Sequence, residues 1–220
     1  MAGIIPISDA SRHSRTLPIL TILIIVVNIA VFLLELQQGE AFVIQWSVVP
    51  AQITAGHHWI NILTAMFMHA GWMHIISNMV FLWCFGPMIE DAMGPARYLP
   101  FYILSGISGS LAQIALVPSS PLPELGASGA IAGIMGAFLV TYPGDRIKSV
   151  MFLGIFWKTT FIPAAILIGV WFLIQLFSQV TAGPSQSGEG VAYAAHVGGF
   201  IFGAIFGRLL ERPQCSEAWS

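Results

Sequence analysis

Two polar side chains, Ser128 and His196, lie in apolar stretches and could together perform acyl transfer. A serine hydroxyl is a weak nucleophile until a neighbouring base takes its proton, and imidazole is the commonest such base. Ser128 begins an apolar stretch that Pro143-Gly144 ends, and His196 lies five residues beyond Val191, where the last apolar stretch begins. At ~1.5 Å of rise per helical residue, both side chains reach a similar depth from the same side. The spacing therefore permits a nucleophile and its base to meet.

Each of these residues also has a plainer interpretation. A lone serine in a membrane helix usually bonds its own backbone and packs against a neighbour. A histidine in a span is more often functional, because ionisable groups are costly there. The pair favours catalysis more strongly than either residue does alone.

His74 and Asn78 supply a second set of groups with chemical use. Their i, i+4 spacing places them on one face of a helix that begins near Gly71-Trp72. An imidazole and an amide can both donate hydrogen bonds to an oxyanion. The competing interpretation is a metal site built from His57, His58, His69 and His74. No H-E-x-x-H motif occurs and no carboxylate has ligand spacing, so the sequence disfavours a metalloprotease.

A third member of a catalytic triad is not evident. Glu90 and Asp91 lie at the opposite end of their helix, and Glu189 lies in a loop. The segment 126–130, Gly-Ala-Ser-Gly-Ala, differs from the G-x-S-x-G nucleophile elbow, because Ala130 replaces the last glycine and no strand precedes it. The sequence predicts a Ser-His dyad.

The composition requires lipid as the solvent of this chain. Of its 220 residues, 56% are hydrophobic and 8% are charged, whereas a soluble domain has about 25% charged residues. The net charge of −2 offers nothing in favour of a nucleic-acid partner. Cys84 and Cys215 are expected to be free thiols.

Apolar stretches predict an all-α membrane protein, a bundle of six transmembrane helices. The first stretch is too long for the apolar region of a signal peptide and is expected to be retained. Residues 1–16 form an N-terminal segment, 17–212 the membrane domain and 213–220 a tail. A short apolar piece at 151–157 is expected to lie along the membrane interface. The six predicted helices are 17–36, 72–88, 98–117, 128–142, 161–180 and 191–210.

The basic residues predict the orientation. All eight lie on one side of the predicted bundle, and the three loops on the other side carry only Glu40, Glu124 and Glu189. Both termini are therefore expected in the cytoplasm of a cell with a bacterial-type plasma membrane. The basic residues are Arg12, Arg15, Arg97, Arg146, Lys148, Lys158, Arg208 and Arg212.

The segments around the fourth predicted helix indicate a wet depression. Residues 118–126 contain three prolines and cannot form a regular helix. Irregular backbone at membrane depth persists only beside protein or a water-filled cavity. We expect the depression to open outward, with Ser128 at its floor on a helix N-terminus that favours negative charge. The long outer loop, about 37–71, is expected to contain an interfacial or re-entrant element.

Small residues recur at three- or four-residue spacing on the two helices that carry Ser128 and His196. Such spacing lets membrane helices approach closely. These residues predict direct packing of the fourth helix against the sixth. They are Gly129, Gly133 and Gly136 on the fourth, and Gly199, Gly203 and Gly207 on the sixth.

Three pieces of this sequence resemble the rhomboid intramembrane proteases of the short bacterial type. They are Met68-His-Ala-Gly-Trp-Met-His74-Ile-Ile-Ser-Asn78, Gly126-Ala-Ser128-Gly129, and Ala195-His196 followed by Gly199-x-x-x-Gly203. Each piece is short, but all three occur in the family's order on the second, fourth and sixth helices. The resemblance covers residues 15–212.

The resemblance implies roles for these residues. Ser128 would be the nucleophile and His196 the base, while Asn78, His74 and the Ser128 backbone N–H would hold the oxyanion. His69 would be structural, and Gly129, Gly199 and Gly203 would support packing. Substrates would be membrane-anchored proteins that enter sideways and are cut near the outer end of their helix, without metal or cofactor. Oligomeric state is left open.

Two positions depart from the family pattern. Ala132 stands where an aromatic residue often stacks on the base, and Ile60-Asn61 replaces a Trp-Arg pair in the first loop. The first departure concerns the orientation of His196 and the second concerns anchoring at the interface.

Two other classes remain as alternatives: a non-catalytic protein that binds or escorts membrane clients, and a small transporter or channel. Loss of the dyad would favour the first, and internal repeats or paired carboxylates the second.

Overall fold

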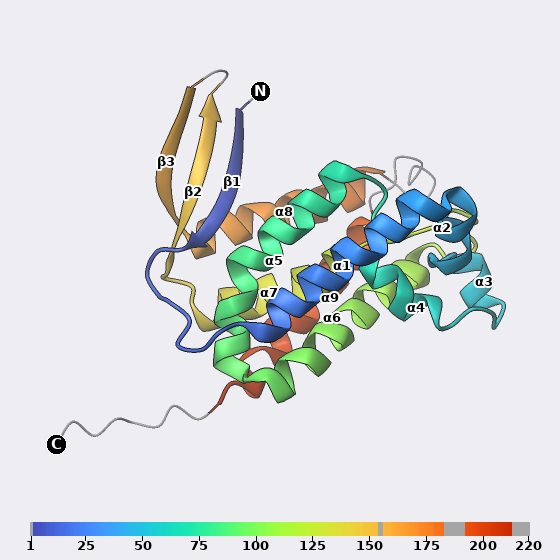
Figure 1. Ribbon diagram of the computed structural model, residues 1–220, viewed down its shortest axis with the longest axis horizontal. Coiled ribbons are helices and arrows are strands. Elements are labelled where there is room, and N and C mark those ends of the chain that lie inside the picture. Colours follow the sequence, from blue (N-terminus) through green and yellow to red (C-terminus); the bar gives the residue numbers. More distant parts are fainter. Residues whose placement is uncertain (1, 154–155, 183–191, 213–220) are drawn as a thin grey trace.

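The apolar stretches of the sequence fold as a helical bundle in the computed structural model, which describes residues 2–153, 156–182 and 192–212 (Figure 1). Four helices, α1, α5, α6 and α8, are long and apolar enough to cross a membrane, and the chain is an integral membrane protein. Helices α7 and α9 have 14 residues each, about 21 Å at the usual rise. The main helices are α1 (Ile19–Gln38), α5 (Trp72–Met93), α6 (Pro95–Leu116), α7 (Ser128–Thr141), α8 (Ala164–Ala182) and α9 (Tyr193–Phe206).

A helix therefore stands at each of the six predicted places, with ends displaced by a few residues. The six-span count stays a prediction, because α7 and α9 are shorter than the ~30 Å apolar layer. The shorter helix α7 lies in the centre of the bundle, surrounded by other helices. Helix α7 packs against α5, α6 and α9, and every residue from Gly129 to Phe138 is buried.

The chain is mostly helical, as predicted, but it is not all-α. Three strands, β1 (Ala2–Asp9), β2 (Arg146–Leu153) and β3 (Phe156–Pro163), form an antiparallel sheet in the order β1-β2-β3. The sheet stands at one end of the bundle, opposite α2 and α3 (Figure 1). The N-terminal segment thus contains a strand. The described residues of the piece at 151–157 belong to the end of β2 and the start of β3, and residues 154–155 lie outside the described residues. Pro6 is accommodated because β1 is an edge strand whose register shifts between Pro6 and Ser8.

Polar contacts join the sheet to the bundle. Arg12 Nε donates to Asp145 Oδ2 at 2.6 Å, and the Arg12 guanidinium lies 4.8 Å from the centre of the Tyr142 ring. Strand β1 packs against α5, and β3 continues directly into α8. The sheet therefore links α5 and α8 at this end of the molecule.

The long loop after α1 is built of short helical pieces, as expected for an element that does not span. Asn61 donates from Nδ2 to the carbonyl oxygens of Gln45 and Ser47, at 3.0 and 2.7 Å. Asn61, which belongs to the pair that differs from the family pattern, thus connects two parts of this loop by hydrogen bonds. The pieces are α2 (Glu40–Trp46), α3 (Pro50–Thr54), α4 (Asn61–Thr64) and the 3-10 turn η1 (Ala65–Phe67).

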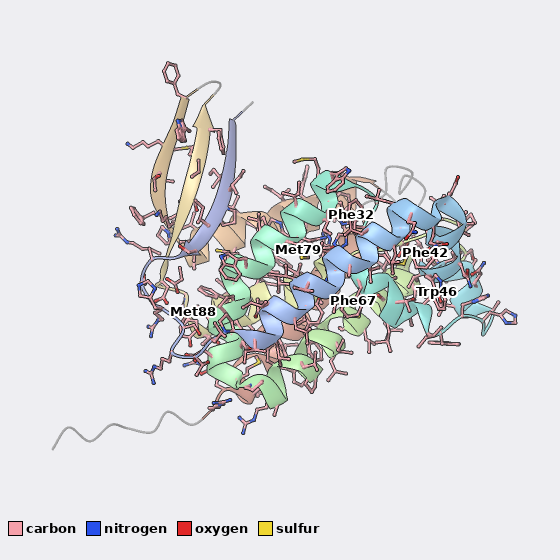
Figure 2. All side chains as sticks on the ribbon, viewed as in Figure 1. Phe32, Phe42, Trp46, Phe67, Met79 and Met88 are labelled. Carbon is pink, nitrogen blue, oxygen red and sulfur yellow. The ribbon has the colours of Figure 1, made fainter. Side chains whose placement is uncertain are left out.

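Helix α1 is fixed to α5 by a buried carboxylate and by aromatic packing. Glu90 on α5 accepts hydrogen bonds from the Leu20 and Thr21 amides, which lie in the first turn of α1 and have no helical partner. Farther along, the rings of Phe32 and Trp72 meet edge to face, 5.0 Å apart. Figure 2 shows Phe32 on α1 together with Met79 and Met88 on α5.

The predicted close approach of α7 and α9 is confirmed. A Cβ at Gly199 would overlap the Gly129 carbonyl oxygen, and one at Gly203 would overlap the Gly133 carbonyl oxygen. A Cβ at Gly129 itself would lie 3.5 Å from the Ala195 oxygen, an ordinary contact. Gly199 and Gly203 are therefore required by space, whereas Gly129 is not.

Candidate active site

Ser128 and His196 meet where α7 and α9 pack together. Ser128 is the first residue of α7, and its Oγ lies 2.7 Å from His196 Nε2. Both side chains are partly buried. The predicted contact is confirmed, and its length suits transfer of a proton from hydroxyl to imidazole. The catalytic roles of the two residues stay predictions.

The loop before Ser128 brings His74 close to the serine. Gly126 has φ +138, a backbone conformation that favours glycine, and a Cβ there would lie 2.9 Å from His74 Cε1 and 3.0 Å from its Nε2. The Gly126 amide donates to the Ala65 carbonyl oxygen at 2.9 Å, which fixes the loop to η1. Glycine is thus needed at 126 for backbone conformation and for the approach of His74.

A cleft of about 610 Å³ gives access to the dyad. It lies among α5, α7, α8 and α9, with Ser128 among its lining residues, as expected for the predicted depression. That the depression opens outward stays a prediction. Its polar lining is His74, Ser77, Asn78, Ser128, Gln175, Ser178, Tyr193 and His196. A second cavity of equal volume, between β1, α1 and α5, is lined almost wholly by apolar side chains and offers no reactive group.

His74 and Asn78 present hydrogen-bond donors to this cleft. His74 Nδ1 accepts from the Ala70 amide at 3.3 Å, which places the proton of a neutral ring on Nε2, beside Gly126. Asn78 is 6% exposed, and its Nδ2 has no partner among the described residues. A buried N–H without a partner is unfavourable in the resting protein and can bind a developing negative charge. Both positions suit the predicted oxyanion role.

Asn78→Ala is expected to lower kcat for peptide cleavage by about 10²-fold, because one oxyanion donor is lost in the transition state. KM and the unfolding temperature should change little, since Asn78 Nδ2 makes no hydrogen bond in the resting protein. Steady-state kinetics with a model substrate check this. An unfolded Asn78→Ala protein would show that Asn78 is structural instead.

His69 lies outside the cleft lining and is consistent with its predicted structural role. It is 2% exposed, and its backbone amide donates to both carboxylate oxygens of Glu35 at 3.1 Å. Its ring meets the His74 ring edge to face, 5.1 Å apart. Glu35 thereby joins the end of α1 to the segment that precedes α5.

Two residues of α8, Gln175 and Trp171, were missed by the sequence interpretation. Gln175 Oε1 lies 2.7 Å from His196 Nδ1, and the Trp171 ring lies 5.8 Å from the imidazole at an angle of 37°. Trp171 thus supplies the aromatic neighbour that Ala132, itself fully buried, cannot. The sequence did contain one indication of these residues, because a Trp and a Gln four positions apart lie on the same face of an apolar helix.

Ser128 also lines a second, small polar cavity. Its volume of about 30 Å³ suits roughly one water, and Ser110 and Glu124 are among its lining residues. Glu124 Oε1 accepts from Gln113 Nε2 at 3.2 Å. Burial raises the pKa of Glu124 to about 7, against the lowering effect of that hydrogen bond. The cavity can hold water within reach of the serine.

The histidines considered as metal ligands do not converge. The rings of His57 and His58 lie 6.5 Å apart in the loop after α3. Within residues 2–153, 156–182 and 192–212, no three His, Cys, Asp or Glu side chains gather into a possible metal site. The arrangement that remains is a serine, a histidine and hydrogen-bond donors around one cleft.

The family model described as "Rhomboid domain" matches residues 56–213 of this chain. The chain is 29% identical to "Rhomboid protease GluP" of Bacillus subtilis over 94% of its own length and 38% of that protein. It is 29% identical to "Rhomboid protein 1, mitochondrial" of Saccharomyces cerevisiae, covering 70% of this chain and 42% of the relative. A chloroplastic relative from Arabidopsis thaliana, "Rhomboid-like protein 11", is 30% identical over 72% of this chain. The chain spans only 38–55% of the length of these relatives.

Proposed function

We propose, from the premise that this chain belongs to the rhomboid family, that it is an intramembrane serine endopeptidase. Its substrates would be membrane-anchored proteins cut near the outer end of their transmembrane helix. The observation that carries the proposal is the 2.7 Å contact between Ser128 Oγ and His196 Nε2 on the wall of an accessible cleft. An intact dyad favours an enzyme over a protein that only binds membrane clients.

The proposed reaction uses four polar side chains of the cleft, those of Ser128, His196, Asn78 and His74. His196 Nε2 takes the hydroxyl proton as Ser128 Oγ attacks the scissile carbonyl carbon. The resulting oxyanion is held by Asn78 Nδ2, His74 Nε2 and the backbone N–H of Ser128 at the start of α7. The protonated imidazole then gives its proton to the leaving amine. Water hydrolyses the acyl-enzyme, and the small polar cavity beside Ser128 is its nearest reservoir.

Substrate would enter between α5 and α8. Both helices line the cleft. In α8, only 11% of the 18 residues from Ala164 to Thr181 are buried inside the protein. A lipid-embedded segment can therefore reach the cleft along the lipid-exposed side of α8, while the face of α8 that carries Trp171 and Gln175 stays packed on His196. Lateral entry delivers an extended backbone to Ser128 without passing through the centre of the bundle.

The proposed topology is six spans, cytoplasmic termini and a cleft that opens outward in a bacterial plasma membrane. The basic residues of the sheet support it, because Arg146, Lys148 and Lys158 are all exposed, and the sheet follows the end of α7 opposite to Ser128. An impermeant maleimide applied to intact cells should then label a cysteine placed at Glu124 and spare one placed at Lys148.

Cleavage of a defined membrane substrate tests the proposed function directly. The purified chain in proteoliposomes is incubated with a panel of single-span proteins, and the product termini are read by mass spectrometry. The wild type should cut at least one of them near the outer end of its helix, and a fluorophosphonate should label Ser128. Ser128→Ala should do neither. Cleavage that persists in Ser128→Ala would show that this serine is not the nucleophile.

A further inference from the structure

The carboxamide of Gln175 contacts the ring nitrogen of His196 that Ser128 does not use. Gln175 is 9% exposed, and its Oε1 lies 2.7 Å from His196 Nδ1. On the other side of the ring, Nε2 lies 2.7 Å from Ser128 Oγ. The three side chains form one continuous chain of hydrogen bonds that joins α7, α9 and α8.

The direction of these hydrogen bonds determines where the imidazole proton lies. An amide oxygen accepts hydrogen bonds and cannot donate them, so the contact with Gln175 Oε1 requires a proton on His196 Nδ1. A neutral imidazole has only one such proton, which leaves the Nε2 lone pair free to accept from Ser128. Only this tautomer can take the hydroxyl proton. We propose that Gln175 is a positioning residue that holds His196 in this tautomer and orientation, an inference that rests on the proposed protease function.

A neutral amide suits this place better than a carboxylate. Gln175 lies inside α8, an apolar helix of membrane length, where a charged group paired with a neutral imidazole would be costly. An amide supplies the acceptor without a buried charge. When His196 is protonated during the reaction, its Nδ1–H bond to Gln175 becomes charge-assisted and stronger. Gln175 therefore supports the base in the place that a carboxylate takes in a catalytic triad.

The packing of α8 against α9 holds the same geometry. Trp171 and Gln175 lie one turn apart on α8, and they face His196 and Phe200, one turn apart on α9. Phe172 stacks on Phe200 with ring centres 4.2 Å apart. The aromatic contacts fix the distance between the helices, and Gln175 sets the rotation and the protonation of the imidazole.

Replacement of Gln175 by two side chains of similar length separates positioning from packing. Gln175→Met removes the amide acceptor. Gln175→Glu keeps a carbonyl oxygen at the same place, because a carboxyl buried in an apolar helix stays protonated and uncharged. Leu176→Met, on the exposed side of α8, is the matched control. Gln175→Met is expected to lower kcat and the fluorophosphonate labelling rate by roughly 10–10²-fold, the effect of leaving a buried donor unpaired, with KM nearly unchanged. Gln175→Glu should recover most of the loss. A Gln175→Met protein as fast as wild type, or a Gln175→Glu protein as slow as Gln175→Met, would overturn the proposal.

The protonation of His196 is measured separately, whether or not the chain cleaves. A low-field proton resonance from Nδ1–H, assigned by its absence in His196→Ala, should appear in wild type and Gln175→Glu and be lost in Gln175→Met. Absence of this resonance from the wild type, or its persistence in Gln175→Met, would contradict the positioning role. A wild type that shows the resonance but cuts no substrate would defeat the protease proposal while supporting the placement of the proton.

Discussion

Replacement of His196 by alanine is expected to lower the rate of substrate cleavage by about 10⁴-fold or more, with the protein still folded. Among the described residues, the Ser128 hydroxyl has no base at hydrogen-bond distance other than His196, whose Nε2 lies 2.7 Å away. Loss of one member of a catalytic pair in a serine protease costs on the order of 10⁴–10⁶ in kcat. The effect should fall on kcat, because His196 binds the reacting hydroxyl and not the substrate helix.

Kinetics in proteoliposomes and the unfolding temperature of each variant check this expectation. His57→Ala, in the exposed loop after α3, is the matched control and should cleave at the wild-type rate. The double variant of Ser128 and His196 should lose no more activity than either single variant, because the two residues act as one unit. A His196→Ala protein that is folded and retains a tenth of the wild-type rate would show that another group is the base.

The contact between Ser128 and His196 was predictable from the sequence because it depends on local signals. The prolines before Ser128 and Pro143-Gly144 indicated where the helix that carries Ser128 begins and ends. The rise per helical residue then predicted that the side chains of Ser128 and His196 lie at the same depth. Glycine spacing indicated which helices touch, and Gly199 and Gly203 do lie against the backbone of α7. Each of these steps uses only residues within one helix or its flanks.

The sheet was not predictable by the same means. Strand β1 pairs with β2 across more than 130 residues of sequence, for example Ile4 with Met151. No local sequence pattern predicts such a pairing. Pro6 within β1 also argues against a strand when the segment is considered alone. The alternation in β2, with Ile147 and Ser149 buried and Lys148 exposed, covers only a few residues, and the apolar piece at 151–157 that follows was interpreted as interfacial. A non-local pairing of short strands leaves little signal in either segment.

The sequence interpretation missed Gln175 and Trp171 for a different reason, which concerns the chemistry that was expected beside His196. The search for a third catalytic member considered carboxylates, because a charged acceptor is the usual partner of a catalytic imidazole. In a membrane the cost of a buried charge favours a neutral amide. The aromatic neighbour of His196 was sought four residues after Ser128, on α7. It lies instead on α8, and only the packing of α8 against α9 reveals this.

Replacement of Gly203 by alanine is expected to destabilise the folded protein strongly and to abolish cleavage. A Cβ at this position would overlap the carbonyl oxygen of Gly133, a backbone atom that cannot rotate away as a side chain could. Overpacking of a core typically costs about 1–3 kcal/mol, and backbone overlap belongs at or above the upper end of that range. Folded proteins are stable by only about 5–15 kcal/mol, so a large part of the margin would be lost.

The same substitution at Gly169 is the matched control. Gly169 lies in α8, and no atom lies within 4 Å of a Cβ added there, so Gly169→Ala should be neutral or slightly stabilising. The unfolding temperatures of the two variants in one detergent give the comparison. Cleavage should be lost only in Gly203→Ala, because α7 carries Ser128 and α9 carries His196, and separation of the two helices lengthens the 2.7 Å contact. Equal unfolding temperatures for Gly203→Ala and wild type would mean that α7 and α9 pack less closely than the structure has them, and the dyad geometry would then need to be redrawn.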